Sequence, residues 1–363
     1  MLKYGEECMR NYSYKNRWQK LLTPEMVSLL TQIHEYKGEL SFITEMKSEA
    51  LMHLAETAKM QSIEASNKIE GIYAPEDRLK SLATDKTIPR TQSEQEIAGY
   101  RDVLLTINES HDFIPIKPPI ILQLHRGLYK FSGKSIGGSY KNTDNYIVEE
   151  DTECNRFVRF QPVPAFETPA AIDAVCDAFV KIQDEADADP LLIIPMFILD
   201  FLCIHPFNDG NGRMSRLLTI LLLYRAGYFV GKYISIENMI EQSKEVYYEV
   251  LQKSSANWHE DKNDYIPFVK YTLGIILAAY RELSSSIKLL TINGKSKPER
   301  IREIIENAQS KITKTEIMEK CPDISQVTIQ RALNDLLKSG EILKIGGGRY
   351  TTYLWNQNKE SRK

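Results

Sequence analysis

One short polar segment carries side chains of the types needed for chemistry at a phosphorus centre. It is His-Pro-Phe-Asn-Asp-Gly-Asn-Gly-Arg-Met-Ser-Arg, residues 205–216. His205 would be a general base near neutral pH, and Asp209 offers the hard oxygen ligand that Mg²⁺ prefers. Arg213 and Arg216 are three residues apart, so a helix would place them on neighbouring parts of one face. A base, a metal carboxylate and two arginines together suit the transfer of a phosphorus-containing group.

The flanking sequence predicts how these side chains are positioned. Apolar runs at 191–204 and 217–223 lie on either side of the segment and are typical of two buried helices joined by a polar turn. The second helix would begin near Asn211 or Gly212. Its N-terminus would present unpaired N–H groups and partial positive charge, and Gly210 and Gly212 would let an anion approach the backbone closely. We therefore expect a phosphate-binding turn at the start of this helix.

The segment resembles the signature of the Fic family, H-x-F-x-[D/E]-G-N-G-R-x-x-R, and matches it at every fixed position. The alternative is an ordinary turn between two capped helices, but that explains neither the histidine nor the arginines. The resemblance implies a mainly α-helical fold with a Fic-type core. It also implies an activity, the transfer of AMP from ATP to a hydroxyl of a target protein with release of pyrophosphate.

The resemblance further implies a role for each residue of the segment. His205 would take the proton of a Ser, Thr or Tyr hydroxyl of the target, and Asp209 would hold Mg²⁺ against the α- and β-phosphates. Arg213 would neutralise charge near the β-phosphate, Arg216 would hold the γ-phosphate, and Phe207 would anchor the turn in the core. The implied ATP-binding residues, with Asn211 also using its side chain, are Gly210, Asn211, Gly212, Arg213, Met214, Ser215 and Arg216.

A second motif precedes this segment. Residues 62–72 predict a helix that ends at Gly71, and Ser66 and Glu70 share one face of it because they are four apart. The stretch resembles the inhibitory motif of Fic proteins, [S/T]-x-x-x-E-[G/N]. In the family, its glutamate pairs with the second arginine of the signature, here Arg216, and takes that arginine away from the γ-phosphate. The alternative is a solvated helix end, where Ser and Glu-Gly are common.

A Gly-rich stretch between the two motifs resembles another part of a Fic site. Residues 137–148 predict a short β-hairpin, similar in position to the flap that holds the target protein by strand addition. Tyr146, Ile147 and Val148 would form this contact. Lys141 stands where family members usually carry Arg, and an ordinary surface hairpin is the alternative.

Several helices are predicted around these motifs. One over 236–254 would border the adenine pocket, with Gln242 or Ser243 in contact with the base, although a core-facing helix predicts the same pattern. His125 lies in an apolar helical stretch and is interpreted as a structural histidine beside the site. The charged residues of a helix predicted over 92–110 are interpreted as a solvated face: Glu94, Glu96, Arg101 and Asp102.

The C-terminal part of the chain predicts a separate domain. Three helices followed by a strand pair are typical of a winged helix-turn-helix domain, whose third helix would read DNA. That helix would expose Gln326, Thr328, Gln330, Arg331, Asn334 and Lys338. This surface is only mildly basic, so packing or protein contact is an equal alternative to DNA binding. The predicted divisions are an N-terminal helical region at 1–91, a catalytic core at 92–290, a linker at 291–297, a winged helix-turn-helix domain at 298–356 and a tail at 357–363.

Composition narrows the setting of the protein. The chain has 363 residues and a net charge of −3, which gives no general argument for nucleic-acid binding. Its five cysteines are scattered, which argues against disulfides and zinc and favours a reducing cytoplasm. The N-terminus lacks an apolar signal core, and the run at 191–204 is too short to span a membrane, so we expect no membrane contact.

The residues and the resemblance together predict an autoinhibited protein adenylyltransferase that uses ATP and Mg²⁺. Two alternatives stay open. The site would remove AMP from modified proteins if Glu70 positioned a water molecule. The chain would instead be a DNA-binding regulator if its Fic core only sensed a nucleotide, but the intact His205 argues against this because a sensor needs no base. Family members often dimerise, so a homodimer is a further expectation.

Overall fold

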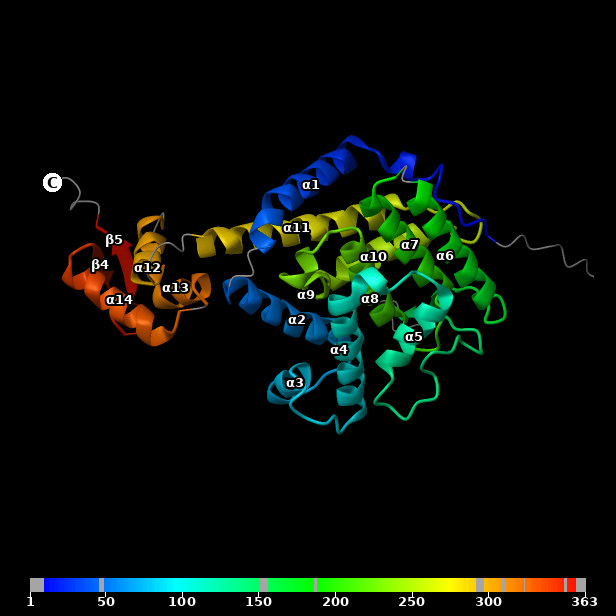
Figure 1. Cartoon of the computed structure of the whole chain (residues 1–363), viewed down its shortest axis with the longest axis horizontal. Coiled ribbons are helices and arrows are strands. Elements are labelled where there is room, and N and C mark those ends of the chain that lie inside the picture. Colours follow the sequence, from blue (N-terminus) through cyan, green and yellow to red (C-terminus); the bar gives the residue numbers. More distant parts are fainter. Residues whose placement is uncertain are drawn as a thin grey trace, which may run out of the picture. The chain divides into compact units, whose positions relative to one another are not determined.

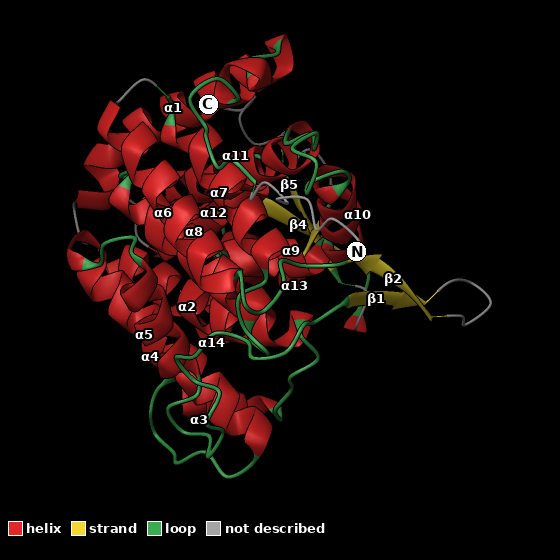
Figure 2. Cartoon of the chain, turned by 90° about the vertical axis from the view of Figure 1, so that its right-hand side faces the viewer, coloured by secondary structure: helices red, strands yellow, loops and turns green. Residues whose placement is uncertain are grey.

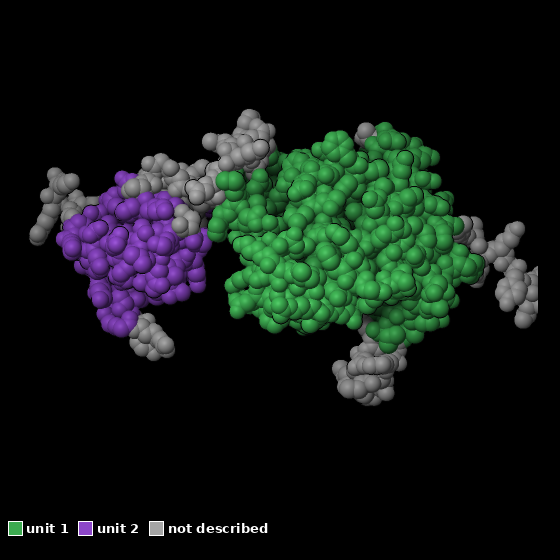
Figure 3. All heavy atoms as spheres, turned by 60° about the horizontal axis from the view of Figure 1, so that its bottom comes forward, with its two compact units in different colours: residues 1–281 green, residues 282–363 purple. Residues whose placement is uncertain are grey.

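The computed structural model describes residues 10–45, 49–150, 156–185, 188–291, 297–308, 311–322, 324–348 and 351–356. These residues are mainly α-helical, as predicted (Figure 1, Figure 2). The chain forms two compact units, residues 1–281 and 282–363 (Figure 3). The predicted N-terminal region and the predicted catalytic core as far as residue 281 belong to the first unit. The division falls inside helix α11, Ile266–Thr291. Residues 292–296 of the predicted linker and the tail 357–363 lie outside the described residues.

Two buried helices form the centre of unit 1. They are α7, Pro190–Ile204, and α8, Asn211–Arg225, which pack against each other (Figure 1). Every residue of α7 after Pro190 is buried, because this helix is apolar on almost all sides. Helices α6, Thr168–Glu185, and α10, Lys244–Ser255, pack on α7. The turn between α7 and α8 is therefore held at both ends by core helices.

A second group of helices lies against α8. Helix α2, Glu49–Ile69, packs on α9, Ile236–Gln242, and on α4, Gln92–Ser110. The prediction of a single helix over 236–254 is wrong, because α9 and α10 are separate helices that meet at Ser243. The other helical elements of unit 1 are η1 Trp18–Leu21, α1 Pro24–Glu45, α3 Glu76–Ala83, η2 His111–Phe113, α5 Pro118–Leu128 and η3 Val230–Lys232. No helix among the described residues is both long and apolar enough to cross a membrane.

A β-hairpin projects from unit 1 (Figure 2). Its strands β1, Ile147–Glu150, and β2, Arg156–Phe160, are antiparallel, with Val148 opposite Val158. The predicted hairpin lies further along the chain than expected from 137–148, since only its last two residues are in a strand. The Gly-rich part is instead a loop, which suits residues that disfavour strands.

Unit 2 has its own apolar core. Its elements after α11 are α12 Lys297–Glu306, β3 Ile312–Thr313, α13 Lys314–Lys320, α14 Gln326–Lys338, β4 Ile342–Ile345 and β5 Thr352–Trp355. The three strands form an antiparallel sheet in the order β3-β5-β4. Ile301, Ile317 and Leu333 lie at the centre of the core, one from each helix. The order of three helices and a strand pair agrees with the sequence, whereas strand β3 was not predicted.

Candidate active site

The turn between α7 and α8 is fixed from inside. His205 follows α7 in a left-handed conformation with φ 53°, and Gly210 precedes α8 with φ 86°. Phe207 is fully buried. The Asn211 side chain braces it, because its Oδ1 accepts from Phe207 N at 2.9 Å and its Nδ2 donates to Phe207 O at 2.8 Å. The amide of Asn211 is thus used inside the turn, so this residue would meet an anion through its backbone and not through its side chain.

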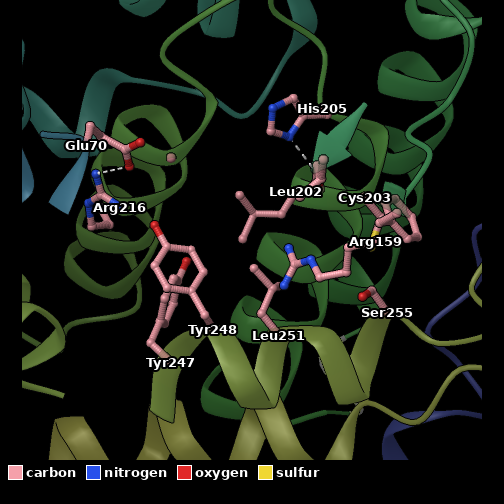
Figure 4. A pocket seen from close by; sticks show the side chains of 13 residues that line it. Glu70, Arg159, Leu202, Cys203, His205, Arg216, Tyr247, Tyr248, Leu251 and Ser255 are labelled. Atoms are coloured by element: carbon pink, nitrogen blue, oxygen red, sulfur yellow. Dashed lines mark hydrogen bonds and ion pairs between the residues drawn. The ribbon is translucent and has the colours of Figure 1, made fainter. Parts of the chain in front are cut away.

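His205 has the environment of a neutral base. Its Nδ1 lies 3.3 Å from Leu202 O, a bond that this nitrogen donates, which leaves Nε2 as the proton acceptor. Burial, helped by the charge of Lys141, lowers the pKa of His205 to about 4. The ring stands at the edge of a cavity (Figure 4). Near pH 7 the imidazole is therefore unprotonated and ready to accept a proton.

A second histidine supports the turn, in agreement with its predicted structural role. The ring of His125 stacks on Phe207 with 3.6 Å between centroids. Its Nε2 donates to Asp209 O at 3.0 Å, and its Nδ1 accepts from Gly138 N at 3.0 Å. Both nitrogens are occupied, so His125 positions the backbone of the turn and does not offer a second base.

Lys141 holds the beginning of the turn, at the C-terminus of α7. Its Nζ donates to Ile204 O at 3.1 Å and to Asn145 Oδ1 at 2.9 Å, and its backbone N donates to Pro206 O at 2.9 Å. A cation beside the last carbonyls of a helix is favourable. Burial lowers the pKa of Lys141 to about 8. This lysine therefore caps α7 directly before His205.

Asp209 and Arg213 belong to one charged cluster. Asp209 Oδ1 accepts from Gly210 N at 2.7 Å, and the carboxylate is about half exposed. Arg213 is buried; its Nη1 lies 2.8 Å from Glu96 Oε2, and its Nη2 donates to Tyr129 OH at 2.9 Å. The hydrogen bond from Tyr129 and the charge of Arg213 help to keep the pKa of Asp209 below its usual value despite burial.

The prediction that the charged residues of α4 form a solvated face is wrong. Glu94, Glu96 and Arg101 are buried. Glu94 pairs with Arg78 at 2.6 Å, Glu96 pairs with Arg213, and Arg101 donates to a backbone carbonyl at 2.6 Å. The cause is pairing between elements. Arg78 from α3 and Arg213 from α8 offset the cost of burying the two glutamates, and Asp85 and Asp102 pair with Arg101.

Glu70 forms an ion pair with Arg216. Arg216 Nη2 donates to Glu70 Oε1 and to Ser66 O, and Nε donates to Ser66 Oγ, all at 2.8 Å. Gly71 has φ 75° and ends α2. The N–H of Gly71 donates to Lys68 O, and the N–H of Ile72 donates to Asn67 O. Glu70 is thus held at a fixed helix end. The contact of Glu70 with Arg216 agrees with the predicted pairing, and Ser66 of the same motif contacts Arg216 as well.

A cavity of about 240 Å³ connects these residues (Figure 4). Five predicted residues line it: Glu70, Ile147, His205, Gly212 and Arg216. The others are Arg159, Phe160, Leu202, Cys203, Tyr247, Tyr248, Leu251 and Ser255. Glu70 and Arg216 lie on one side of it and Arg159 on another, with Tyr248 and Leu251 below (Figure 4). One side of the cavity is charged, and much of the remainder is apolar or aromatic.

Some predicted contacts are not among the residues that line this cavity. Met214 is fully buried, Ser215 Oγ donates to Gly212 O at 2.8 Å, and Gln242 ends α9 away from the lining residues. Tyr146 and Val148 are exposed on the flap, whereas their neighbour Ile147 faces the cavity. This division follows from the alternation of side chains along a strand.

Sequence reasoning missed Arg159 and the flap strand that carries it. Arg159 lies on β2, just beyond the stretch in which the hairpin was expected. Burial raises the pKa values of Tyr247 and Tyr248, and the positive charge of Arg159 opposes this rise. The same charge adds to the lowering of the pKa of His205 by burial. The available signal was the high content of aromatic and β-branched residues in Arg-Phe-Val-Arg-Phe, residues 156–160, which favours a strand.

Asp209 fits a metal that is held partly by phosphates. Among the described residues, no group of three or more His, Cys, Asp or Glu side chains forms a complete metal site. Mg²⁺ needs no such cage where one carboxylate and the phosphates of a substrate supply its ligands. Asp209 offers a half-exposed carboxylate directly before the N-terminus of α8, where an anion would bind.

Comparisons with known proteins agree with this geometry. A protein adenylyltransferase Fic of Aedes aegypti is 28% identical over 273 residues, covering 68% of this chain and 49% of that protein. Protein adenylyltransferase fic-1 of Caenorhabditis elegans is 23% identical over 302 residues, covering 80% and 52%. The chain thus spans about half the length of the curated relatives it matches. The crystal structure of a Fic family protein from Desulfovibrio desulfuricans G20 shares the fold, with a TM-score of 0.60 and 21% identity, covering 93% of this chain and 97% of that one.

The match to a family model falls on the same part of the chain. Residues 115–223 match the Fic/DOC family and include the whole turn, helix α7 and all but the last two residues of α8. The fold, the arrangement of the turn and these relatives all point the same way. Residues 115–223 of this chain form a domain of the Fic/DOC family.

Proposed function

We propose that the chain is an autoinhibited protein adenylyltransferase, which moves AMP from ATP to a hydroxyl of a target protein. The observation that carries this is a neutral histidine at the edge of a cavity whose other side is formed by Arg216 and the N-terminus of α8. A base and an anion site that share one cavity suit attack by a hydroxyl on a phosphate. Relatives named protein adenylyltransferase Fic support the same activity.

The site would act in the following way. His205 Nε2 accepts the proton of the target hydroxyl, whose oxygen attacks the α-phosphorus while the bond to pyrophosphate breaks. Negative charge moves onto the leaving pyrophosphate, where the N–H groups at the start of α8 and the two arginines Arg213 and Arg216 stabilise it. Mg²⁺ held by Asp209 would neutralise further charge on the phosphates.

Glu70 would keep the site inactive. Its carboxylate accepts a hydrogen bond from Arg216 and lies against the first turn of α8, where a Cβ placed on Gly212 would clash with Glu70 Oε1. A phosphate that approached Arg216 would compete with this carboxylate for the same guanidinium and would be repelled by it. ATP would therefore bind productively only after Glu70 leaves.

The flap would hold the target protein. Tyr146, Val148 and Val158 are exposed on the hairpin, while Ile147 faces the cavity. A strand edge with exposed apolar side chains suits an extended segment that adds to the sheet. The target hydroxyl would then lie next to His205.

The test uses the Glu70→Gly protein with Mg²⁺ and ATP labelled at either the α- or the γ-phosphate. Label on the protein from the α position only is the expected result, because AMP carries the α-phosphate alone. Label from the γ position would mean phosphate transfer and would contradict the proposal.

Removal of AMP is a second candidate, because Glu70 lines the same cavity as His205. A carboxylate at this place would position a water for attack on a protein-bound AMP. To separate the two activities, a protein is first labelled by the Glu70→Gly variant and is then incubated with the wild-type enzyme. Loss of label that requires Glu70 favours removal, and retention of label excludes it.

DNA binding by unit 2 is a separate proposal, supported by the exposed polar side chains of α14. These include Gln326, Arg331, Asn334 and Lys338. A gel shift with genomic fragments at moderate salt tests it: a retarded band that Arg331→Ala weakens supports binding, and no retardation excludes it.

A further inference from the structure

Two cations and two carboxylates form a charge-balanced cluster at the start of α8. Lys134 Nζ lies 3.0 Å from Glu96 Oε1 and 3.7 Å from Asp209 Oδ2. Arg213 makes the equivalent bridge, with Nη1 2.8 Å from Glu96 Oε2 and Nη2 3.8 Å from Asp209 Oδ1. Each cation is therefore closer to Glu96 than to Asp209, the proposed metal ligand.

The two cations differ in their freedom to move. Arg213 has a side chain that is 1% exposed, and it also donates to Tyr129 OH, so it is held on three sides. The side chain of Lys134 is 34% exposed and reaches the cluster from the loop that follows α5. Its flexible stem and compact ammonium let it change partners, whereas the buried guanidinium is fixed.

The two oxygens of Asp209 also differ. Oδ1 accepts from Gly210 N at 2.7 Å and faces Arg213, while Oδ2 faces Lys134. A divalent cation that used the less engaged oxygen, Oδ2, would meet the ammonium of Lys134. Like charges at this distance repel, so the lysine would have to withdraw.

We propose that Lys134 is a built-in competitor of the divalent cation at Asp209, and that Glu96 receives the lysine when the metal binds. This rests on the proposed function, in which Asp209 holds Mg²⁺. Glu96 is suited to the role because it is buried and fixed, with Gln92 Nε2 donating to its Oε1 at 3.0 Å. The affinity for metal then depends on how Lys134 divides between the two carboxylates.

This arrangement predicts opposite effects for two charge-removing substitutions. Lys134→Gln removes the competitor and strengthens metal binding. Glu96→Gln removes the alternative partner, leaves Lys134 on Asp209 and weakens metal binding. A merely structural role would weaken metal binding in both variants, so the sign of the Lys134→Gln effect separates the two explanations.

The measurement is the binding of Mn²⁺, followed by the EPR signal of the free ion. It uses the Glu70→Gly protein in excess over α,β-methylene-ATP, an analogue from which AMP cannot be transferred. Lys130→Gln is the matched control: it removes the same charge, but Lys130 pairs with Asp102 at 2.9 Å. Relative to this control, Lys134→Gln should lower the dissociation constant of Mn²⁺ about two- to fivefold, the size expected for a partly exposed ion pair.

An unchanged or raised dissociation constant in Lys134→Gln, compared with Lys130→Gln, overturns the inference. Lys134 is partly exposed, so this variant carries the test if Glu96→Gln does not fold. If the Glu70→Gly protein binds no more Mn²⁺ than the free analogue does, Asp209 is not a metal ligand and the competition between Lys134 and the metal is overturned as well. Normal Mn²⁺ behaviour without any AMP transfer from ATP would overturn the proposed function alone.

Discussion

At the scale of single residues, the proposed base His205 is held in one conformation by its neighbours. His205 sits in a left-handed conformation that is uncommon for a residue with a Cβ, and its Nδ1 is tied to the helix that precedes it. The bond at Nδ1 sets the tautomer, and burial keeps the ring neutral. Such backbone strain at a reactive residue is typical of functional sites.

This environment predicts an unusual titration. The pKa of His205 is lowered from 6.5 to about 4, so the ring binds its proton less readily in the folded protein than in the unfolded chain. The neutral form should therefore persist as pH falls through 6.5, and stability should decline between pH 6.5 and about 4 because only the unfolded chain takes up the proton. Imidazole NMR signals assigned with His205→Ala check this, and a midpoint near 6.5 would contradict it.

Ser66 should contribute to the inhibited state. Its Oγ accepts from Arg216 Nε at 2.8 Å, and its buried carbonyl accepts from Nη2. Ser66→Ala removes one charge-assisted bond and should raise AMP transfer by the otherwise wild-type protein about fivefold, which corresponds to about 1 kcal/mol. The initial rate of α-phosphate label incorporation measures this. A rate equal to that of wild type would show that Ser66 has no part in holding Arg216.

At the scale of elements, helix α2, the proposed inhibitory helix, is attached to its neighbours along its length. Ser62 Oγ donates to Glu237 Oε2 at 2.8 Å, and Lys68 pairs with Glu241 at 2.8 Å. Lys244 Nζ donates to Ile69 O at 2.7 Å, directly before Glu70. These contacts join α2 to α9 and to the start of α10. Release of Glu70 therefore needs a change in the last turn of α2, and departure of the whole helix is unnecessary.

Lys244 should restrain this last turn. Lys244→Met removes the bond to Ile69 O, so the turn that carries Glu70 frays more readily and basal AMP transfer should rise about two- to fivefold. Lys253→Met is the matched control on the same helix, where the lysine pairs with exposed Glu249. Equal transfer rates in the two variants would contradict a role for Lys244.

Helix α7 carries a buried charge that must be satisfied. Asp200 accepts from Trp258 Nε1 at 2.7 Å and from Tyr14 OH at 2.9 Å, and it lies 3.5 Å from Arg10. Asp200→Ala would leave Arg10 buried without this partner and should lower the free energy of unfolding by about 3 kcal/mol. Chemical denaturation measures this against Asp177→Ala, which removes an exposed carboxylate of α6. A difference below about 1 kcal/mol would contradict the role of Asp200.

The sequence predicted these elements unevenly, for physical reasons. The boundaries of α7 and α8 followed from long apolar runs and from Gly210, which are local signals. The burial of Glu96 and the network around Asp200 depend on partners far away in the chain, which no local pattern reveals. The break between α9 and α10 was missed because Ser243 is compatible with a continuous helix.

At the scale of the whole molecule, the candidate site belongs entirely to unit 1. Its parts come from α2, the hairpin, the turn 205–216 and α10, which are distant in the sequence. The resemblance drew attention to the turn and to the proposed inhibitory helix because both carry short motifs. It did not identify Arg159 or Ser255, since a cavity wall assembled from separate elements has no continuous sequence pattern.

The most informative single measurement compares label from the α-phosphate of ATP on wild type, Glu70→Gly, and Glu70→Gly with His205→Ala. The pairing of Glu70 with Arg216 predicts weak labelling of wild type and strong labelling of Glu70→Gly. The role of His205 as base predicts that the double variant loses this label. Equal labelling of wild type and Glu70→Gly would contradict inhibition by Glu70, and undiminished labelling of the double variant would contradict catalysis by His205.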